Sequence, residues 1–150
     1  MAIGDVAVFD QFKEDLGAKL HDLNTDDMYY CLNTAALSPT EALSDPRYGT
    51  GGGTNLTTTE VSGGNVTAGG SNLAPTDAWT RAGATVTFDL NDVSITQAGA
   101  NPTNARWLVV YNFTDTGKRA PLYLDLGADV DLSAGDFTVT WNLSGVFTLA

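Results

Sequence analysis

Apolar and polar residues alternate along much of the second half of the chain. Within residues 84–150 this period of two recurs in short runs, as in residues 86–90 and 137–143, where Thr, Asp or Asn separates the apolar residues. Such alternation is typical of antiparallel strands that are buried on one face. Residues 107–111 are apolar without alternation, which predicts a central strand buried on both faces. We expect residues 122–126 to pair with that strand.

One segment near the N-terminus has the period of a helix instead. Its large apolar residues are three or four positions apart, at Phe9, Phe12, Leu16, Leu20 and Leu23. The spacing predicts a helix over residues 6–23, with Asp5 as its N-cap and Asn24 in a left-handed turn at its end. Gly17 weakens the middle of such a helix by about 1 kcal/mol relative to Ala. The helix therefore depends on tertiary packing.

Two further segments lie between the expected helix and the alternating half. Residues 28–32 form a short apolar run, which predicts a buried strand with Cys31 as a small core residue. Residues 38–78 hold several prolines and glycine clusters, which predicts a long, partly mobile surface excursion. The whole pattern predicts one mainly β domain over residues 1–150. We expect an antiparallel β-sandwich or jelly-roll-like barrel with one N-terminal α-helix.

Charge narrows the classes of partner. Eighteen Asp and Glu residues against seven Lys and Arg residues give a net charge of -11 and a pI near 4.1. An acidic surface repels nucleic acid and anionic membranes, so we expect neither as a partner. The start of the chain has no signal-peptide pattern, and no apolar run approaches the roughly 20 residues of a membrane span. We expect synthesis in the cytoplasm.

The stretch FTDTGKRAPLY, residues 113–123, is compatible with three motifs. Asp115 begins the Asp-Thr-Gly triplet of aspartic proteases, but those enzymes need two copies, and the adjacent cations would keep this carboxylate ionised. Gly117 and Lys118 resemble the end of a phosphate-binding loop, but the required spacing is absent. We favour a hairpin turn, with Gly117 at positive φ and Lys118 and Arg119 protecting the sheet edge.

Residues for catalysis or metal binding are sparse. His21 is the only histidine, so Ser-His-Asp and Cys-His arrangements lack support. Four aspartates lie within twelve residues, at Asp125, Asp129, Asp131 and Asp136. They lack the EF-hand spacing, and solvent-facing strand and turn positions explain them equally well, so the calcium alternative stays open. We expect no enzyme, no catalytic residue, no cofactor and no metal site.

Several blocks of the sequence resemble a known family. They are TAGG at residues 67–70, VVYN at 109–112, PL at 121–122 and AGDFTVTW at 134–141. With the leading helix, these blocks resemble a family of small structural proteins of tailed bacteriophages, found among head-assembly proteins. The resemblance covers most of the chain.

The resemblance implies a capsid decoration, or cement, protein, which binds the outside of a phage head and braces the major capsid protein as part of the virion. An acidic protein suits that outer surface better than contact with packaged DNA. The N-terminal arm, residues 1–8, supplies the expected capsid contacts at Ala2, Ile3, Val6 and Val8, because an exposed apolar arm is buried only against a partner. Packing of these residues on their own domain is an equal alternative. Self-association as a dimer or trimer stays open.

Two other classes of function compete with this one. A carbohydrate-binding or adhesin module of a tail fibre would stack sugars on exposed aromatic rings, for which Trp79 and Tyr48 are the candidates, with Trp107 a further one. A head-tail connector or tail-tube subunit shares the β-rich pattern.

Overall fold

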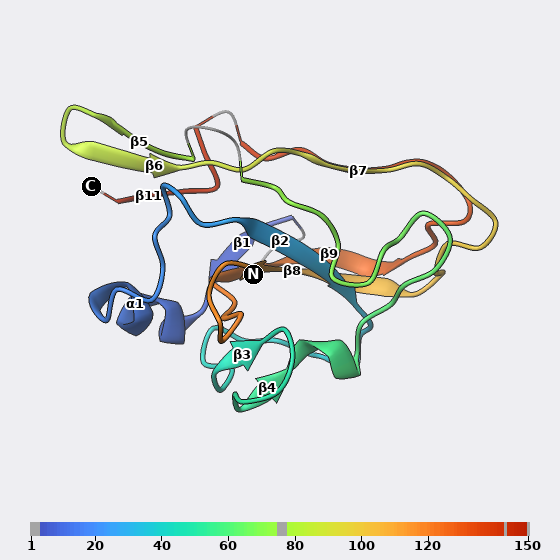
Figure 1. The fold of residues 1–150 in the computed structure, drawn as a ribbon. Coiled ribbons are helices and arrows are strands. Elements are labelled where there is room, and N and C mark those ends of the chain that lie inside the picture. The colour runs from blue at the N-terminus through green and yellow to red at the C-terminus, as the bar shows by residue number, and fades with distance from the viewer. Residues whose placement is uncertain (1–3, 75–77, 143, 150) are drawn as a thin grey trace.

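A four-stranded antiparallel sheet forms the centre of the fold in the computed structural model, which describes residues 4–74, 78–142 and 144–149 (Figure 1). In spatial order its strands are β1 (Val6–Val8), β9 (Leu122–Val130), β8 (Ala105–Asn112) and β2 (Met28–Asn33). β8 pairs with both β9 and β2 and is buried on both faces, because Leu108 and Val109 face different cores. The expected central strand, its pairing partner and the buried strand containing Cys31 are all confirmed.

A second layer lies across one face of this sheet (Figure 1). It consists of β7 (Val93–Ile95) paired with β10 (Phe137–Val139), and of β6 (Thr85–Phe88) between β5 (Trp79–Ala82) and β11 (Phe147–Leu149). The alternating residues behave as expected, since Phe88, Val93 and Ile95 enter the core between the layers. The mainly β fold of antiparallel sheets with one N-terminal helix is confirmed, and the two layers form a sandwich.

Residues 34–60 cover the other face of the central sheet. They contain a short parallel pair, β3 (Pro46–Arg47) and β4 (Thr54–Asn55), followed by the 3-10 helix η1 (Leu56–Thr58). Leu56 is fully buried against Cys31 and Val109 in a second core. The expected surface excursion thus lies on the sheet but also supplies part of the interior, since Val66 is buried as well.

The N-terminal helix is much shorter than its period predicts. α1 spans Asp10–Gly17, and Phe9 precedes it with an extended backbone and no side-chain cap. The expected helix over residues 6–23 is therefore wrong at both ends, and neither Asp5 nor Asn24 bounds it. Residues 6–8 form β1 because β-branched valines fit a strand, and here they pair with β9. Lys19 takes a left-handed φ of 59° just after the helix, which turns the chain away.

Candidate binding groove

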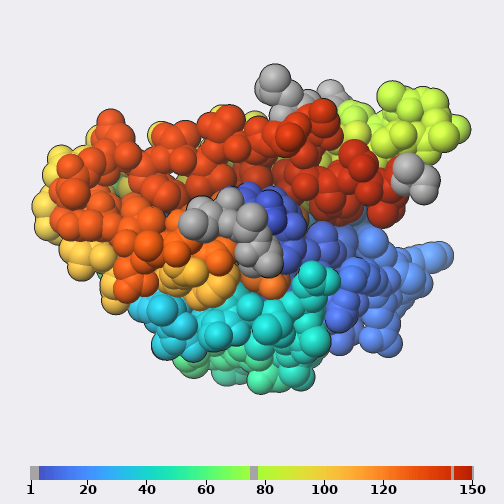
Figure 2. Space-filling model, turned by 180° about the vertical axis from the view of Figure 1, so that it is seen from behind, coloured from blue at the N-terminus to red at the C-terminus, as the bar shows by residue number. Residues whose placement is uncertain are grey.

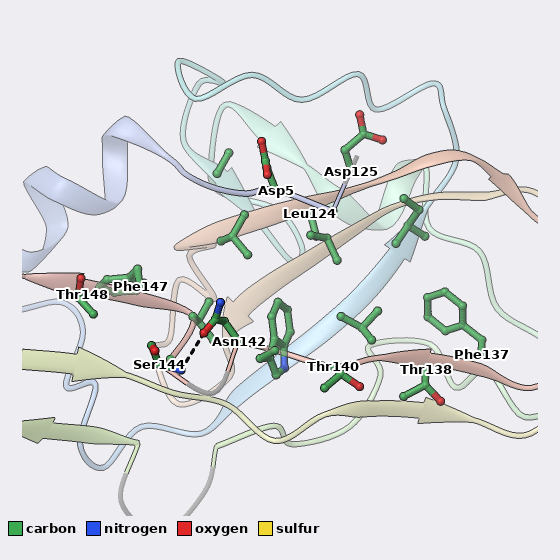
Figure 3. Close-up of a pocket in the computed structure, with 18 of the residues that line it drawn as sticks. Asp5, Leu124, Asp125, Phe137, Thr138, Thr140, Asn142, Ser144, Phe147 and Thr148 are labelled. Atoms are coloured by element: carbon green, nitrogen blue, oxygen red, sulfur yellow. Dashed lines mark hydrogen bonds between the residues drawn. The ribbon is translucent and has the colours of Figure 1, made fainter. Parts of the chain in front are cut away.

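An open groove separates the edge of the central sheet from the C-terminal segment (Figure 3). Strands β1 and β9 form one wall, and β10, β11 and the residues between them form the other. Seen from behind, the blue N-terminal residues meet the orange β9 and the red C-terminal segment on this side of the molecule (Figure 2). The groove volume is about 910 Å³. Since ligand pockets commonly measure roughly 300–1,000 Å³, there is room for a short peptide.

The lining of the groove mixes polar residues with a set of apolar side chains. Its half-buried apolar side chains also pack on the core between the layers: Val6, Leu126, Val130, Phe137, Val139, Val146 and Phe147. Trp141 is buried beneath them, and its indole N–H donates to the carbonyl of Asn91 at 2.9 Å. The groove is therefore an extension of the core that the second layer leaves open to solvent.

Three of the strands that line the groove are at the edges of their sheets. β1 ends the four-stranded sheet, β10 pairs with β7, and β11 pairs with β6. Just after β1, the N–H of Phe9 donates to the carbonyl of Pro121 at 3.0 Å, so the main-chain groups of Ala7, two positions earlier, also face β9. Because hydrogen-bonding direction alternates along an antiparallel strand, the N–H and C=O groups of Val6 and Val8 point to the outer edge. β1 thus offers main-chain groups on the side away from β9.

Three carboxylates of the described residues line the groove. Asp5, Glu41 and Asp125 belong to its lining, and none of the described lining residues is Lys or Arg. Arg106 holds Asp125 with an N–O distance of 2.8 Å, and the amide of Gly127 donates to the same carboxylate at 2.7 Å. Asp5 and Glu41 are exposed. The described lining therefore carries acidic and no basic side chains, although Arg106 offsets the charge of Asp125.

A second, shallower depression adjoins the groove. It has a volume of about 560 Å³, and Glu41 and Asp125 line it as they line the groove. Its other lining includes Asp10, Trp107 and Tyr123. Tyr123 belongs to the second core, so the depression lies on the opposite face of the central sheet from the groove. The two hollows flank the same sheet edge.

The expected capsid-contact residues are only partly described. Ala2 and Ile3 lie outside the described residues. Val6 and Val8 are half-buried in β1 with their side chains against the core between the layers. In residues 6–8, therefore, the expected apolar arm is an edge strand of the protein's own sheet.

The aromatic residues proposed for sugar stacking are partly engaged in packing. Trp79 is half-buried in β5, with its ring centroid 6.4 Å from those of Phe88 and Phe147. Tyr48 stacks on Tyr111 with centroids 4.5 Å apart, and its hydroxyl donates to Glu60 at 2.9 Å. Neither residue lines the groove or the depression, whereas Trp107 lines the depression.

The stretch from Phe113 to Tyr123 connects β8 to β9 through a turn, as predicted. The amide of Lys118 donates to the carbonyl of Asp115 at 2.9 Å. Two details differ from expectation. Lys118, with a φ of 47°, takes the left-handed conformation expected of Gly117, where a Cβ would instead meet the guanidinium groups of Arg119 and Arg47. Arg119 does not protect an edge but turns inward and donates to Asp115 at 2.7 Å.

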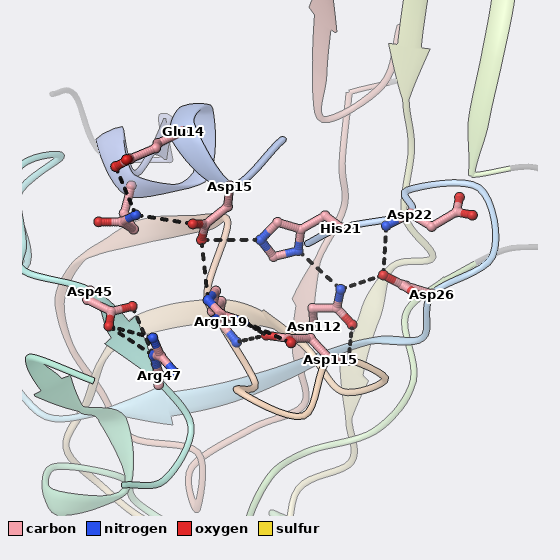
Figure 4. A network of polar contacts seen from close by, with 11 residues as sticks. Glu14, Asp15, His21, Asp22, Asp26, Asp45, Arg47, Asn112, Asp115 and Arg119 are labelled. Atoms are coloured by element: carbon pink, nitrogen blue, oxygen red, sulfur yellow. Dashed lines mark hydrogen bonds and ion pairs between the residues drawn. The ribbon is translucent and has the colours of Figure 1, made fainter. Parts of the chain in front are cut away.

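This turn belongs to a buried polar network at one end of the central sheet (Figure 4). Arg119 also lies 3.7 Å from Asp15 of α1, which in turn lies 3.7 Å from Nε2 of His21. Burial raises the pKa of Asp115, but hydrogen bonds from the amides of Gly117 and Arg119 and from the Arg119 guanidinium outweigh it. The net pKa of Asp115 is below its ordinary value. The carboxylate is thus held ionised, contrary to a protease dyad.

Asn112 fixes the tautomer of His21 in this network. The amide nitrogen of Asn112 donates to Asp26 at 2.6 Å and lies 3.1 Å from Nδ1 of His21, while its oxygen accepts from the amide of Asp115. Because that nitrogen is a donor, Nδ1 must accept and Nε2 carries the proton. Burial lowers the pKa of His21, and the nearby carboxylates only partly oppose this effect. The ring is neutral at pH 7 and serves the fold.

The described part of the chain shows neither a cluster of metal ligands nor a reactive thiol. No three His, Cys, Asp or Glu side chains among the described residues come together as metal ligands. Of the aspartates considered for calcium, Asp131 accepts from the amide and hydroxyl of Ser133, and Asp136 accepts from the amide of Gln97. Burial raises the pKa of the Cys31 thiol far above its usual range, which suppresses the reactive thiolate. Within the described residues, no helix is both long and apolar enough to cross a bilayer.

Comparisons with known proteins add no neighbour. No protein-family model, curated protein or solved structure matches the chain. The site therefore rests on geometry.

Sequence reasoning identified Phe137 and Val139 as strand residues but missed their exposure in a groove. Their alternation with threonines indicates an apolar face without indicating what covers it. The one usable signal was the excess of acidic residues, three of which line the groove, namely Asp5, Glu41 and Asp125.

Proposed function

We propose that the protein is a non-enzymatic virion structural protein that binds the outer surface of a phage capsid and stabilises it. The observation that carries this proposal is the solvent-open groove beside the edge strand β1, in which half-buried apolar side chains such as Val6, Phe137 and Val139 are collected. Exposed apolar surface collected in one place marks a binding site, because its burial in a complex releases ordered water. The resemblance to phage head proteins implies the major capsid protein as the partner.

The charge of the protein supports this location. A net charge of -11 is unfavourable beside packaged DNA and acceptable on the outside of a shell. A decoration protein acts by adding contacts between neighbouring capsid subunits, so its stabilising effect comes from binding energy alone. We expect the groove and the edge strand to make these contacts.

Co-sedimentation of the purified protein with expanded, undecorated heads of its own phage tests the proposal. We expect ordered density on the outer shell, at near-stoichiometric occupancy, in electron micrographs. Decorated heads should also release DNA at a higher temperature than undecorated ones. Absence of binding to heads, with density at the tail instead, would contradict the proposal.

Glycan binding is the second candidate function, and the depression beside Trp107 is the observation that favours it. Trp107 is half-buried there, next to the exposed carboxylates of Asp10 and Glu41. Aromatic rings beside carboxylates are typical of sugar sites. Binding to host-surface glycans that is lost in Trp107→Ala, and retained in Trp79→Ala, would support this function over capsid binding.

A further inference from the structure

We propose that the edge of β1 binds an extended segment of the partner as an added strand, in which apolar residues alternate with Lys or Arg. The identity of that partner as the capsid protein rests on the proposed function. The geometry of the site does not, because it follows from the strand edge, the two hollows and the charge. Strand addition is an established mode of peptide recognition in which main-chain hydrogen bonds supply affinity and side-chain pockets supply specificity.

The main-chain part of the site is already formed. Val6 and Val8 direct their N–H and C=O groups away from β9, as the hydrogen bond between Phe9 and Pro121 requires. The opposite edge of the same sheet, at β2, is covered by residues of this chain: the amides of Val61 and Leu73 donate to the carbonyls of Leu32 and Met28. Among the described residues, the outer edge of β1 is therefore where an added strand can pair with this sheet, as far as Asp10, whose amide donates to the carbonyl of Glu41 at 2.9 Å.

The two hollows correspond to the two faces of an added strand. Side chains on the face of Val6 and Val8 point to the core between the layers, and so into the groove with Phe137, Val139 and Val146. Side chains on the other face point to the depression, where Glu41 is exposed and the carboxylate of Asp10 is ion-paired with Lys13 at 2.7 Å. Because successive strand residues point to opposite faces, an alternating apolar and cationic segment meets both requirements.

Charge excludes the opposite choice of partner. The carboxylates of Asp5 and Glu41 stand at the groove, and the chain carries eleven excess negative charges. An acidic segment would meet like charges there, which costs binding energy, whereas a basic segment is attracted. A second copy of this chain is acidic too, and is therefore a poor occupant.

A peptide assay tests the site without a capsid. The probe is a fluorescent synthetic peptide of alternating Val and Lys, compared with one of alternating Val and Glu. A third peptide has the composition of the first, with its valines in one block and its lysines in another. We expect saturable binding of the first and at least about tenfold weaker binding of the other two. Equal affinity for the two basic peptides overturns the proposal, since attraction by net charge alone does not depend on alternation.

Two matched pairs of variants locate the binding. Val6→Pro removes the outward N–H of β1, whereas Val6→Thr keeps it and removes similar apolar surface. Glu41→Lys reverses a charge between the hollows, and Glu14→Lys makes the same change on the exposed side of α1. We expect about tenfold weaker binding of the alternating peptide and of heads in Val6→Pro and Glu41→Lys, a smaller loss in Val6→Thr, and a change within about twofold in Glu14→Lys. Thermal unfolding verifies that each variant is folded. If Val6→Pro does not fold, Glu41→Lys still decides the test.

The outcomes separate this inference from the proposed function. If heads bind and neither variant weakens binding, strand addition at β1 is wrong and the capsid role stands. If the alternating peptide binds as expected and heads do not, strand addition stands and the capsid role is wrong. If Glu41→Lys changes self-association, measured by analytical ultracentrifugation, instead of peptide binding, the occupant is a second copy and the inference is overturned.

Discussion

The two edges of the central sheet end in opposite ways. At β2, residues 60–73 run alongside the strand, and the amide of Leu73 donates to the carbonyl of Met28 at 2.6 Å. At β1, the sheet ends beside an open groove whose lining is partly apolar. Natural sheets protect their edges because an unpaired strand recruits other strands. The chain thus covers one edge with its own residues and leaves the other beside a groove, which is the edge we propose for binding.

The largest effect should come from the covered edge. Leu73 is buried at 2% exposure, and Leu73→Ala leaves a cavity beside β2. We expect a loss of about 2–5 kcal/mol in the free energy of unfolding, measured with urea. Val139→Ala, at the half-buried groove wall, should lose about 1 kcal/mol or less because solvent fills the space. Equal losses for the two variants would remove the distinction between the edges.

Gly70 gives the next largest effect, also at the covered edge. Its φ is 63°, and a Cβ there would meet the backbone carbonyl of Tyr30 in β2. Gly70→Ala should therefore lose about 2 kcal/mol or more, since backbone strain and a steric clash add. Gly83 has the same φ of 63° with nothing within 4 Å, so Gly83→Ala isolates the strain. A thermal unfolding series that ranks Gly83→Ala as the worse variant would contradict the packing of residues 60–73 on β2.

Low pH should lower the free energy of unfolding through His21, which lies at the end of the covered edge. The pKa of His21 in the fold lies below its ordinary 6.5, chiefly because of burial, among Asp15, Asp115, Asp26 and Arg119. Below pH 6.5 the unfolded chain therefore binds a proton that the folded chain does not, and stability falls as the pH falls from 6.5 to the folded pKa.

Urea unfolding between about pH 7 and pH 5 measures this dependence. His21→Gln should remove this pH dependence of the free energy of unfolding over that range. Asp115 does not contribute there, because its lowered pKa affects stability only below its ordinary value of 3.8. A slope that persists unchanged in His21→Gln would assign the acid sensitivity to another group.

The smallest effect on stability is expected at the open edge. Glu41→Lys changes an exposed residue, so its free energy of unfolding should stay within about 0.5 kcal/mol of the wild-type value. The same variant should weaken peptide binding, as proposed above. A variant that loses binding and keeps its stability would sharpen the division between the two edges, whereas a large loss of stability would show that Glu41 serves the fold.

Part of the fold could be predicted because side-chain alternation is a local property. An apolar residue at every second position, as in residues 86–90 and 137–143, indicates a strand that is buried on one face, wherever the segment lies in the molecule. The unbroken apolar run at residues 107–111 likewise indicated a strand with two covered faces, and β8 has them. The period of 3.6 was less reliable, because Val6 and Val8 fitted it and yet form a strand.

The candidate site could be predicted only in its charge. Acidic composition indicated which partners the surface repels, but the groove requires the C-terminal segment to lie opposite β1. His21 illustrates the same limit, since its partner Asn112 is 91 positions away in the sequence. The turn at Asp115 was recognisable, but the inward direction of Arg119 was not, because Asp15 comes from α1.

The sequence by itself determined that the protein is mainly β, acidic, and built of short antiparallel strands, since composition and local period specify these. The tertiary structure decided that residues 6–8 are a strand, that the chain covers the β2 edge, and that the β1 edge adjoins a groove. These outcomes depend on pairings such as Val6 with Leu124, whose free energy arises only when distant segments meet. A local pattern carries no information about which segment will cover which edge.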